Sequence, residues 1–161
     1  MNPPLGPALR RSLIAYWRQL DEELRAAGFT DQGFPDGRVL RICLNEPNVT
    51  VARVGRELGI TRQGAGKIVA SLRERGYVAL TPSPEDAREK IVTLTDRATD
   101  FLAARRKAVQ KIDRQLRKEA GDDAFDGLQR ILAALGGDSH SRMTDYLPFI
   151  RDLAVLIDPD E

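Results

Sequence analysis

The sequence of 161 residues has one cysteine, one histidine and no long apolar run. A single cysteine, Cys43, excludes an internal disulfide and is typical of a reducing compartment. His140 is the one histidine, so we expect no zinc cluster and no Ser/His/Asp or Cys/His catalytic set. No stretch is long enough to span a membrane, and residues 1–17 lack the apolar core of a secretory signal. These absences favour a cytoplasmic protein that is not an enzyme and holds no cofactor.

Charge is unevenly distributed, although the whole chain carries a net charge of only +1. Residues 51–80 hold six Lys or Arg and two acidic residues, and residues 97–118 hold eight against two. Residues 119–161 hold ten acidic residues and three Arg. A basic segment is either a solvated helix face or a surface for an anionic partner such as nucleic acid. Both interpretations stay open for residues 97–118.

The fragment Gly64-Ala65-Gly66-Lys67 invites a nucleotide-binding interpretation, which its surroundings exclude. A P-loop requires a glycine five residues before its Gly-Lys pair and a Ser or Thr after it. Here those positions hold Thr61 and Ile68. A dinucleotide-binding G-x-G-x-x-G pattern that starts at Gly64 has Val69 in its third glycine position. The two glycines therefore need another explanation.

Apolar periodicity and helix-ending residues predict a mainly helical chain with one β-hairpin. Thr61 and Thr95 are expected N-caps. The hairpin combines the β-type runs 77–80 and 90–94 around a polar tip with two prolines. The predicted helices are 8–27, the segment between Pro35 and Pro47, 51–58, 62–75, 96 to about 120, 122–135, and a last one after Thr144.

A short helix, a glycine turn, a second helix and a hairpin are the order of a helix-turn-helix unit. The second helix of such a unit enters the major groove of DNA, where its positive N-terminus also favours phosphate. Arg62 is predicted to pair with guanine and Gln63 with adenine. Lys67 is predicted to bind phosphate. Thr61 either caps the helix or also contacts phosphate.

Two further basic residues, Arg73 and Arg75, lie near the far end of the same helix. They are either solvated or in contact with the DNA backbone, and the sequence leaves both possibilities open.

The stretches VARVGRELGITRQGAGKIVASLRERGYV (51–78) and SPEDAREKIVTLT (83–95) resemble the MarR family of bacterial transcriptional regulators. In that family the second stretch is the wing of a winged helix and carries an Asp-x-Arg motif. The motif here is Asp86-Ala87-Arg88, and Leu94-Thr95 matches the start of the helix that follows the wing. The resemblance covers residues 8–136.

The resemblance implies a winged helix-turn-helix core with a two-stranded wing, flanked by N- and C-terminal helices that form a dimerisation domain. We expect residues 1–34 to form the N-terminal dimerisation helix, 35–94 the DNA-binding region, and 95–161 the long helix and the C-terminal dimerisation helices. The implied function is a homodimeric regulator, expected to act as a repressor, on a pseudo-palindromic operator in double-stranded DNA.

The wing and the glycines complete the expected DNA-binding set. Arg88 is expected to enter a minor groove, with Asp86 holding its guanidinium, and Lys90 to contact DNA beside it. The alternative is that Asp86 and Arg88 are ordinary loop charges. Gly64 and Gly66 stand where related sequences usually carry Ala, Ser or Thr, and glycine allows close approach of the helix backbone to DNA.

Many members of the family bind a small aromatic or anionic effector between the dimer helices and the winged helix. Tyr16, Trp17, Arg41 and Cys43 are the candidates for such a pocket here. The alternative for the two aromatic residues is core or dimer packing. Cys43 is either a redox sensor or, in its apolar run VLRICL, an inert buried thiol.

Two further points stay open. A winged helix that contacts proteins, without sequence-specific DNA binding, is the alternative function. Residues 138–161 extend beyond what the family usually needs, and we interpret their apolar part as a helix that packs on the dimerisation domain.

Overall fold

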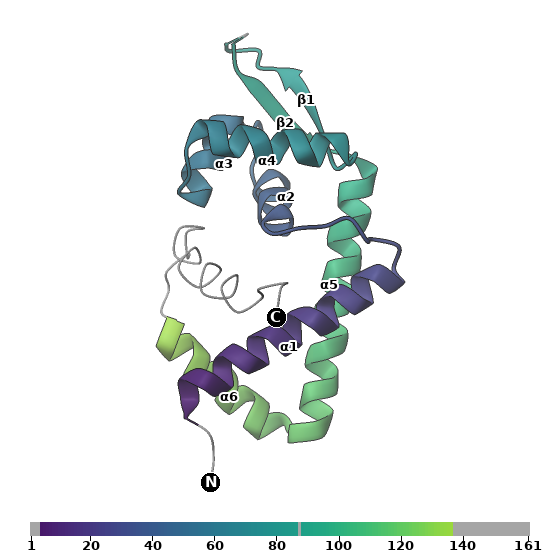
Figure 1. Cartoon of the computed structure of the whole chain (residues 1–161), viewed down its shortest axis with the longest axis vertical. Coiled ribbons are helices and arrows are strands. Elements are labelled where there is room, and N and C mark those ends of the chain that lie inside the picture. The colour runs from purple at the N-terminus through teal and green to yellow at the C-terminus, as the bar shows by residue number, and fades with distance from the viewer. Residues whose placement is uncertain (1–3, 87, 137–161) are drawn as a thin grey trace, which may run out of the picture. The chain divides into compact units, whose positions relative to one another are not determined.

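The computed structural model describes residues 4–86 and 88–136, and it contains six helices and one hairpin in those ranges (Figure 1). Gly33–Thr99 form one compact unit, and the residues up to Gln32 together with residues 100–136 form another. The mainly helical fold with a two-stranded antiparallel sheet confirms the expected fold class. The bounds are α1 Leu5–Ala26, α2 Asp36–Asn45, α3 Val51–Leu58, α4 Arg62–Glu74, β1 Val78–Pro82, β2 Lys90–Leu94, α5 Asp96–Ala120 and α6 Asp122–Gly136.

The short helices of the Gly33–Thr99 unit begin and end at residues suited to those positions. The Thr50 hydroxyl accepts the backbone N–H of Arg53 at 3.2 Å and so caps α3. Gly59 ends α3 in the left-handed region, with φ of 69°, which glycine adopts without strain. The Thr61 hydroxyl caps α4 by accepting the N–H of Gly64 at 3.0 Å. The predicted cap at Thr61 is therefore confirmed.

The hairpin is longer on its first strand than the sequence predicts. Antiparallel pairing runs from Val78↔Leu94 to Pro82↔Lys90, so β1 continues to Pro82. Pro82 is tolerated because it stands at the end of a strand in a two-stranded sheet. Beyond the hairpin, the N–H of Val92 donates to the carbonyl of Val49 at 2.7 Å, and Thr50 bridges Ile91. The segment that precedes α3 is thus bonded to β2.

The core of this unit comes from the apolar faces of its helices and from the hairpin. α4 turns Ala65, Val69 and Leu72 inward, as the apolar periodicity predicts, whereas Ile68 is half-buried. Tyr77, which directly precedes β1, is only 1% exposed. The other residues that are fully buried here include Val39, Leu40, Val49, Val54 and Leu58.

A buried ion pair joins α2 to the end of α4. Both guanidinium nitrogens of Arg75 donate to the carboxylate of Asp36, one of them at 3.0 Å. The same carboxylate accepts the backbone N–H of Gly33 at 2.8 Å. Asp36 is 4% exposed, and Arg75 also lies over the ring of Tyr77, at 5.7 Å from its centroid. Arg75 therefore has a structural role, and the solvated alternative is wrong; a contact of Arg75 with the DNA backbone stays a prediction.

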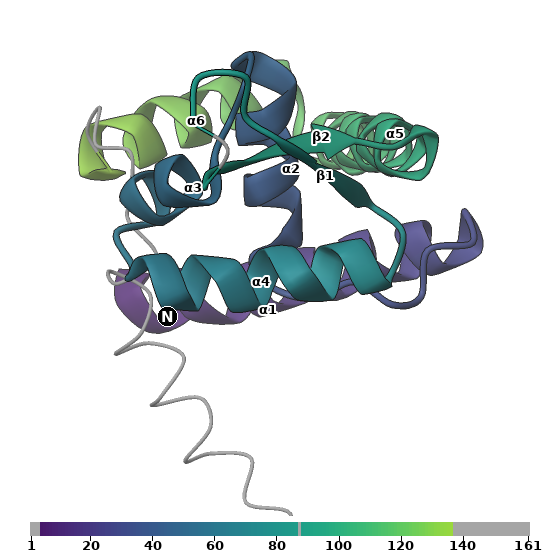
Figure 2. The same ribbon diagram turned by 90° about the horizontal axis from the view of Figure 1, so that it is seen from above.

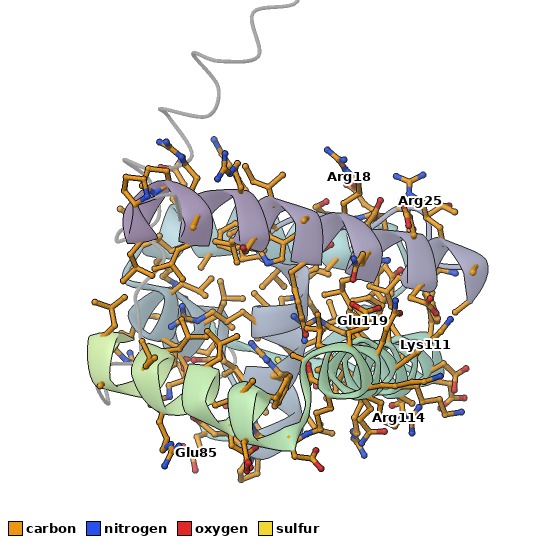
Figure 3. The ribbon with its side chains drawn as sticks, turned by 90° about the horizontal axis from the view of Figure 1, so that it is seen from below. Arg18, Arg25, Glu85, Lys111, Arg114 and Glu119 are labelled. Atoms are coloured by element: carbon orange, nitrogen blue, oxygen red, sulfur yellow. The ribbon has the colours of Figure 1, made fainter. Side chains whose placement is uncertain are left out.

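The flanking unit is built from α1, most of α5, and α6. Leu20 and Leu24 of α1, Phe101 and Ile112 of α5, and Phe125 of α6 are buried. Figure 3 shows Arg18 and Arg25 projecting from α1 on the side opposite α5. On the other side, Lys111 of α5 makes an ion pair with Glu23 of α1 at 2.6 Å.

Several large apolar side chains of this unit stay exposed in the single chain. On α6, Ile131 is 57% exposed and Leu135 is 64% exposed. Leu128 and Leu132 of the same helix are also exposed, as are Leu13 and Trp17 of α1. Of the five residues in the apolar stripe of α6, Phe125 is buried and the other four are exposed. We call Leu128, Ile131, Leu132 and Leu135 the α6 apolar face.

Among the residues that the structure describes, no helix is long and apolar enough to cross a membrane. The predicted helix after Thr144, and its packing on the dimerisation domain, fall outside the described residues.

Candidate nucleic-acid interface

The first turns of α4 present the polar side chains that the sequence singled out. Arg62, Gln63 and Lys67 are exposed, while the opposite face of the helix is buried. Thr61 is exposed too, but its hydroxyl oxygen already accepts the Gly64 N–H. Because the inward face fixes the rotation of α4, these three polar side chains are held outward by the core.

The hairpin tip is organised by hydrogen bonds to its own backbone. The Asp86 carboxylate accepts the backbone N–H of Arg88 at 2.9 Å. The N–H of Glu89 donates to the Asp86 carbonyl, and the N–H of Ser83 donates to the Glu89 carbonyl, both at 2.9 Å. Asp86 thus holds the backbone at Arg88, whereas the sequence predicted a bond to its guanidinium. A carboxylate two residues ahead reaches an N–H more easily than the end of a long side chain.

A concave surface of about 400 Å³ brings the start of α4 together with the base of the hairpin. Figure 2 shows the three contributing elements, α3, α4 and the hairpin, within the same unit. Five of the predicted DNA-contact residues line it, whereas Thr61, Gly64, Lys67 and Asp86 do not. The lining is Thr50 and Val51 from the start of α3, Arg62, Gln63 and Gly66 from α4, and Arg88, Glu89 and Lys90 from the hairpin. We call it the α4–wing hollow.

Three residues of the α4–wing hollow were not predicted from the sequence. Thr50 and Val51 enter it because the segment before α3 is bonded to β2, a long-range contact that local patterns do not reveal. Glu89 is half-buried and contributes the one carboxylate among the lining residues. Glu89 could have been predicted as a lining residue, because it lies between Arg88 and Lys90 in the sequence, directly before β2.

The two glycines of α4 have different surroundings. A Cβ atom at Gly64 would lie 3.3 Å from the hydroxyl oxygen of Thr61, a tight contact with the group that caps the helix. A Cβ atom at Gly66 would meet only Val51 Cγ1, at 4.0 Å, which is ordinary van der Waals contact. Local packing therefore accounts for Gly64, and close approach to DNA is not needed to explain it. At Gly66, packing against the described residues leaves room for a larger side chain and so does not explain the glycine.

The predicted effector candidates lie on α1 and α2. Tyr16 is half-buried, and burial together with the Asp113 carboxylate raises the pKa of its phenol, against the opposing effect of Arg105. Trp17 is 40% exposed. Arg41 is exposed on α2, and Cys43 is half-buried two residues further along. An effector pocket formed by these residues stays a prediction.

Burial, together with the nearby Glu46 carboxylate, raises the pKa of the Cys43 thiol to about 11. The thiolate, which is the reactive form, is therefore scarce near neutral pH. This environment favours the inert-thiol interpretation over the redox sensor.

We expect Cys43 to react with a thiol-specific reagent at pH 8 at least about tenfold more slowly in the folded protein than in urea. The raised pKa removes most of the thiolate in the native state, while unfolding restores it. Absorbance of the released chromophore measures both rates. Equal rates in the two states would restore the redox interpretation.

Across the described ranges, no group of three or more His, Cys, Asp or Glu is placed to hold a metal ion.

Comparison with known proteins shows which family this arrangement resembles. A profile of the MarR family matches residues 27–89, which span the second to fourth helices and most of the hairpin. A transcriptional repressor, CouR, solved bound to a 23-mer DNA duplex, has a TM-score of 0.65 and 27% identity, covering 83% of this chain and 93% of that one. Over residues 27–89 the chain resembles the MarR family. Members of this family are non-enzymatic DNA-binding regulators, in line with the expectation from the sequence.

Two further solved structures share the fold. CouR bound to p-coumaroyl-CoA gives a TM-score of 0.63 at 25% identity, over 84% of this chain and 94% of that one. MarR of E. coli in its apo form shares the fold at a TM-score of 0.62 and 21% identity, over 84% of this chain and 98% of that one.

The HTH-type transcriptional regulator PetP of Rhodobacter capsulatus is 26% identical over 105 residues, or 65% of this chain. The match spans 63% of the length of PetP.

Proposed function

We propose that this chain is a cytoplasmic transcriptional regulator of the MarR family that binds double-stranded DNA as a homodimer and acts as a repressor on a pseudo-palindromic operator. The observation that carries the proposal is the α4–wing hollow, where Arg62 and Gln63 of the recognition helix lie on one surface with Arg88 and Lys90 of the wing. A helix aimed at a major groove and a wing aimed at the next minor groove are thereby held by one folded unit.

The charges of the hollow support an anionic partner. Arg62, Arg88 and Lys90 contribute three cationic side chains, against one carboxylate from Glu89. Arg62 and Gln63 have the donor geometry that reads guanine and adenine, and Lys67, outside the hollow, is suited to phosphate. The CouR structure on a DNA duplex, at 27% identity, adds support from a relative.

Homodimerisation is supported by the α6 apolar face. A helix that exposes Ile131 and Leu135 to water at 57% and 64% is disfavoured in an isolated chain. A C2 dimer would bury the same surface on both subunits. We propose that residues 1–34 and 95–161 supply this interface, and that residues 35–94 bind DNA.

We further propose that a small aromatic or anionic ligand releases the operator. The binding of p-coumaroyl-CoA by CouR supports this class of effector. Tyr16, Trp17, Arg41 and Cys43 remain the candidate contacts.

The proposal is tested by selection of bound sequences from a pool of randomised duplexes, followed by footprinting and a salt titration. We expect two protected half-sites separated by about 10 base pairs. The logarithm of affinity should fall with the logarithm of salt concentration, with a slope of about −0.9 for each phosphate contact. No enrichment and no salt-dependent binding would instead favour the alternative, a winged helix that contacts proteins.

Arg88→Ala is expected to lower affinity for the selected duplex about tenfold to one hundredfold, because it removes the cation aimed at the minor groove. Glu89→Gln is the matched variant at the next residue. It is expected to raise affinity about two- to fivefold, since it removes a negative charge that repels phosphate. Fluorescence anisotropy at fixed salt measures both. Unchanged affinity in the Arg88 variant would show that the wing tip does not contact DNA.

A further inference from the structure

Gly66 lies in the interior of α4, and neither its backbone conformation nor its packing against the described residues requires a glycine. Glycine in the middle of a helix is destabilising relative to alanine. Two internal causes usually justify it: a left-handed backbone conformation, or a neighbour too close for a Cβ. Gly66 lies within α4 and has no positive φ, and its Cβ would meet one side-chain atom at 4.0 Å. Nothing within residues 4–86 and 88–136 therefore explains this glycine, and a molecule bound at the exposed face of α4 is the remaining candidate for what it accommodates.

The direction in which Gly66 is open is known from its place on the helix. It follows Arg62 by four residues and Gln63 by three, so all three lie on the same face of α4. That face lines the α4–wing hollow, which Arg88 and Lys90 of the hairpin also line. A side chain added at Gly66 would project into the hollow, between the recognition helix and the wing.

The geometry of a duplex says what passes through this space. In B-DNA a major groove and the adjacent minor groove are separated by one sugar–phosphate strand. A protein that places α4 in one groove and the wing in the next must accommodate that strand between them. We propose that Gly66 provides the clearance for this strand, and that its backbone lies in van der Waals contact with the deoxyribose–phosphate chain. This inference rests on the proposed function.

The composition of the hollow favours contact by shape rather than by charge alone. Glu89 lies in the lining together with the three cations, and Val51 provides an apolar part of the surface next to Gly66. A pure anion site would exclude a carboxylate at that place. Contact of the strand with a bare helix backbone and an apolar neighbour suits a sugar, which carries little charge, and predicts that the contact carries no sequence information.

The test replaces Gly66 with alanine in the full-length protein. We expect the thermal midpoint to rise by about 1 to 4 °C, because alanine favours the helix and has room in the free protein. Affinity is expected to fall about tenfold, because the added methyl group crowds the strand. The loss should be equal on the selected duplex and on a mixed-sequence duplex. Calorimetry at matched protein concentration and fluorescence anisotropy measure the two effects.

Gly127→Ala is the matched control, because Gly127 is a helix-interior glycine of α6 with a Cβ position 3.9 Å from the nearest atom, Nη2 of Arg130. It should raise the midpoint similarly and, with an unchanged oligomeric state checked by sedimentation because Ile131 lies one turn further along α6, leave DNA affinity unchanged. Wild-type affinity in the Gly66 variant, a lower midpoint in it, or a loss restricted to one sequence would each overturn the inference while leaving the proposed function intact. A wild-type protein that binds no duplex would overturn both.

Discussion

Ile131→Asp combined with Leu135→Asp is expected to convert the proposed dimer to a monomer and to lower affinity for the proposed operator by about one hundredfold or more. The two side chains are one helical turn apart and more than half exposed in the single chain. Loss of burial of their exposed parts on both subunits removes about 4 to 7 kcal/mol of dimerisation free energy. A monomer also loses the gain in affinity from engaging two half-sites at once. Sedimentation and anisotropy measure the two outcomes.

The control for this double variant lies on the same helix. Gln129 is exposed and lies with Asp123, Asp126 and Arg130 on a polar part of α6. Gln129→Asp adds a negative charge there and should leave both the dimer and operator affinity unchanged. A double variant that sediments as the wild type would show that the α6 apolar face has no role in dimerisation.

Asp36→Ala is expected to lower the free energy of unfolding by about 3 kcal/mol, a large fraction of the 5–15 kcal/mol typical of a domain. The substitution leaves the guanidinium of Arg75 without its carboxylate in a site where the Arg75 side chain is only 23% exposed. It also removes the acceptor of the Gly33 N–H. Urea denaturation followed by circular dichroism measures the change.

The pair can be tested further with a second substitution. Arg75→Met together with Asp36→Ala should recover part of the lost stability, because most of the cost comes from the unpaired charge and not from loss of the pair itself. If Asp36→Ala alone stays within about 0.5 kcal/mol of the wild type, the interaction is not a stabilising one.

Local chemistry made most of the fold predictable. Thr61 and Thr95 cap helices, Gly59 ends one, and the β-type runs pair as a hairpin, so the elements follow from neighbouring residues. The family motif at the wing and the exposed residues at the start of α4 were also accessible, because they depend on spacing within a few residues.

Long-range partners were not accessible in the same way. Arg75 and Asp36 lie 39 residues apart, and nothing in the sequence around either one indicates the other. The α4–wing hollow likewise depends on the bond between Val92 and Val49, which brings Thr50 and Val51 beside the hairpin. The two glycines of α4 look alike in the sequence, and only the distance to the Thr61 hydroxyl separates Gly64 from Gly66.

The bond between Val92 and Val49 has a consequence for which operators the protein can accept. It ties the hairpin to the segment that leads into α3, so the wing cannot swing away from the helix pair without breaking a 2.7 Å hydrogen bond. In the proposed complex the distance between α4 and the wing is consequently fixed by the protein. The duplex must then adapt its groove geometry to that distance. Sequences that are stiff, or whose minor groove has the wrong width, then carry a deformation cost at base pairs that no side chain touches.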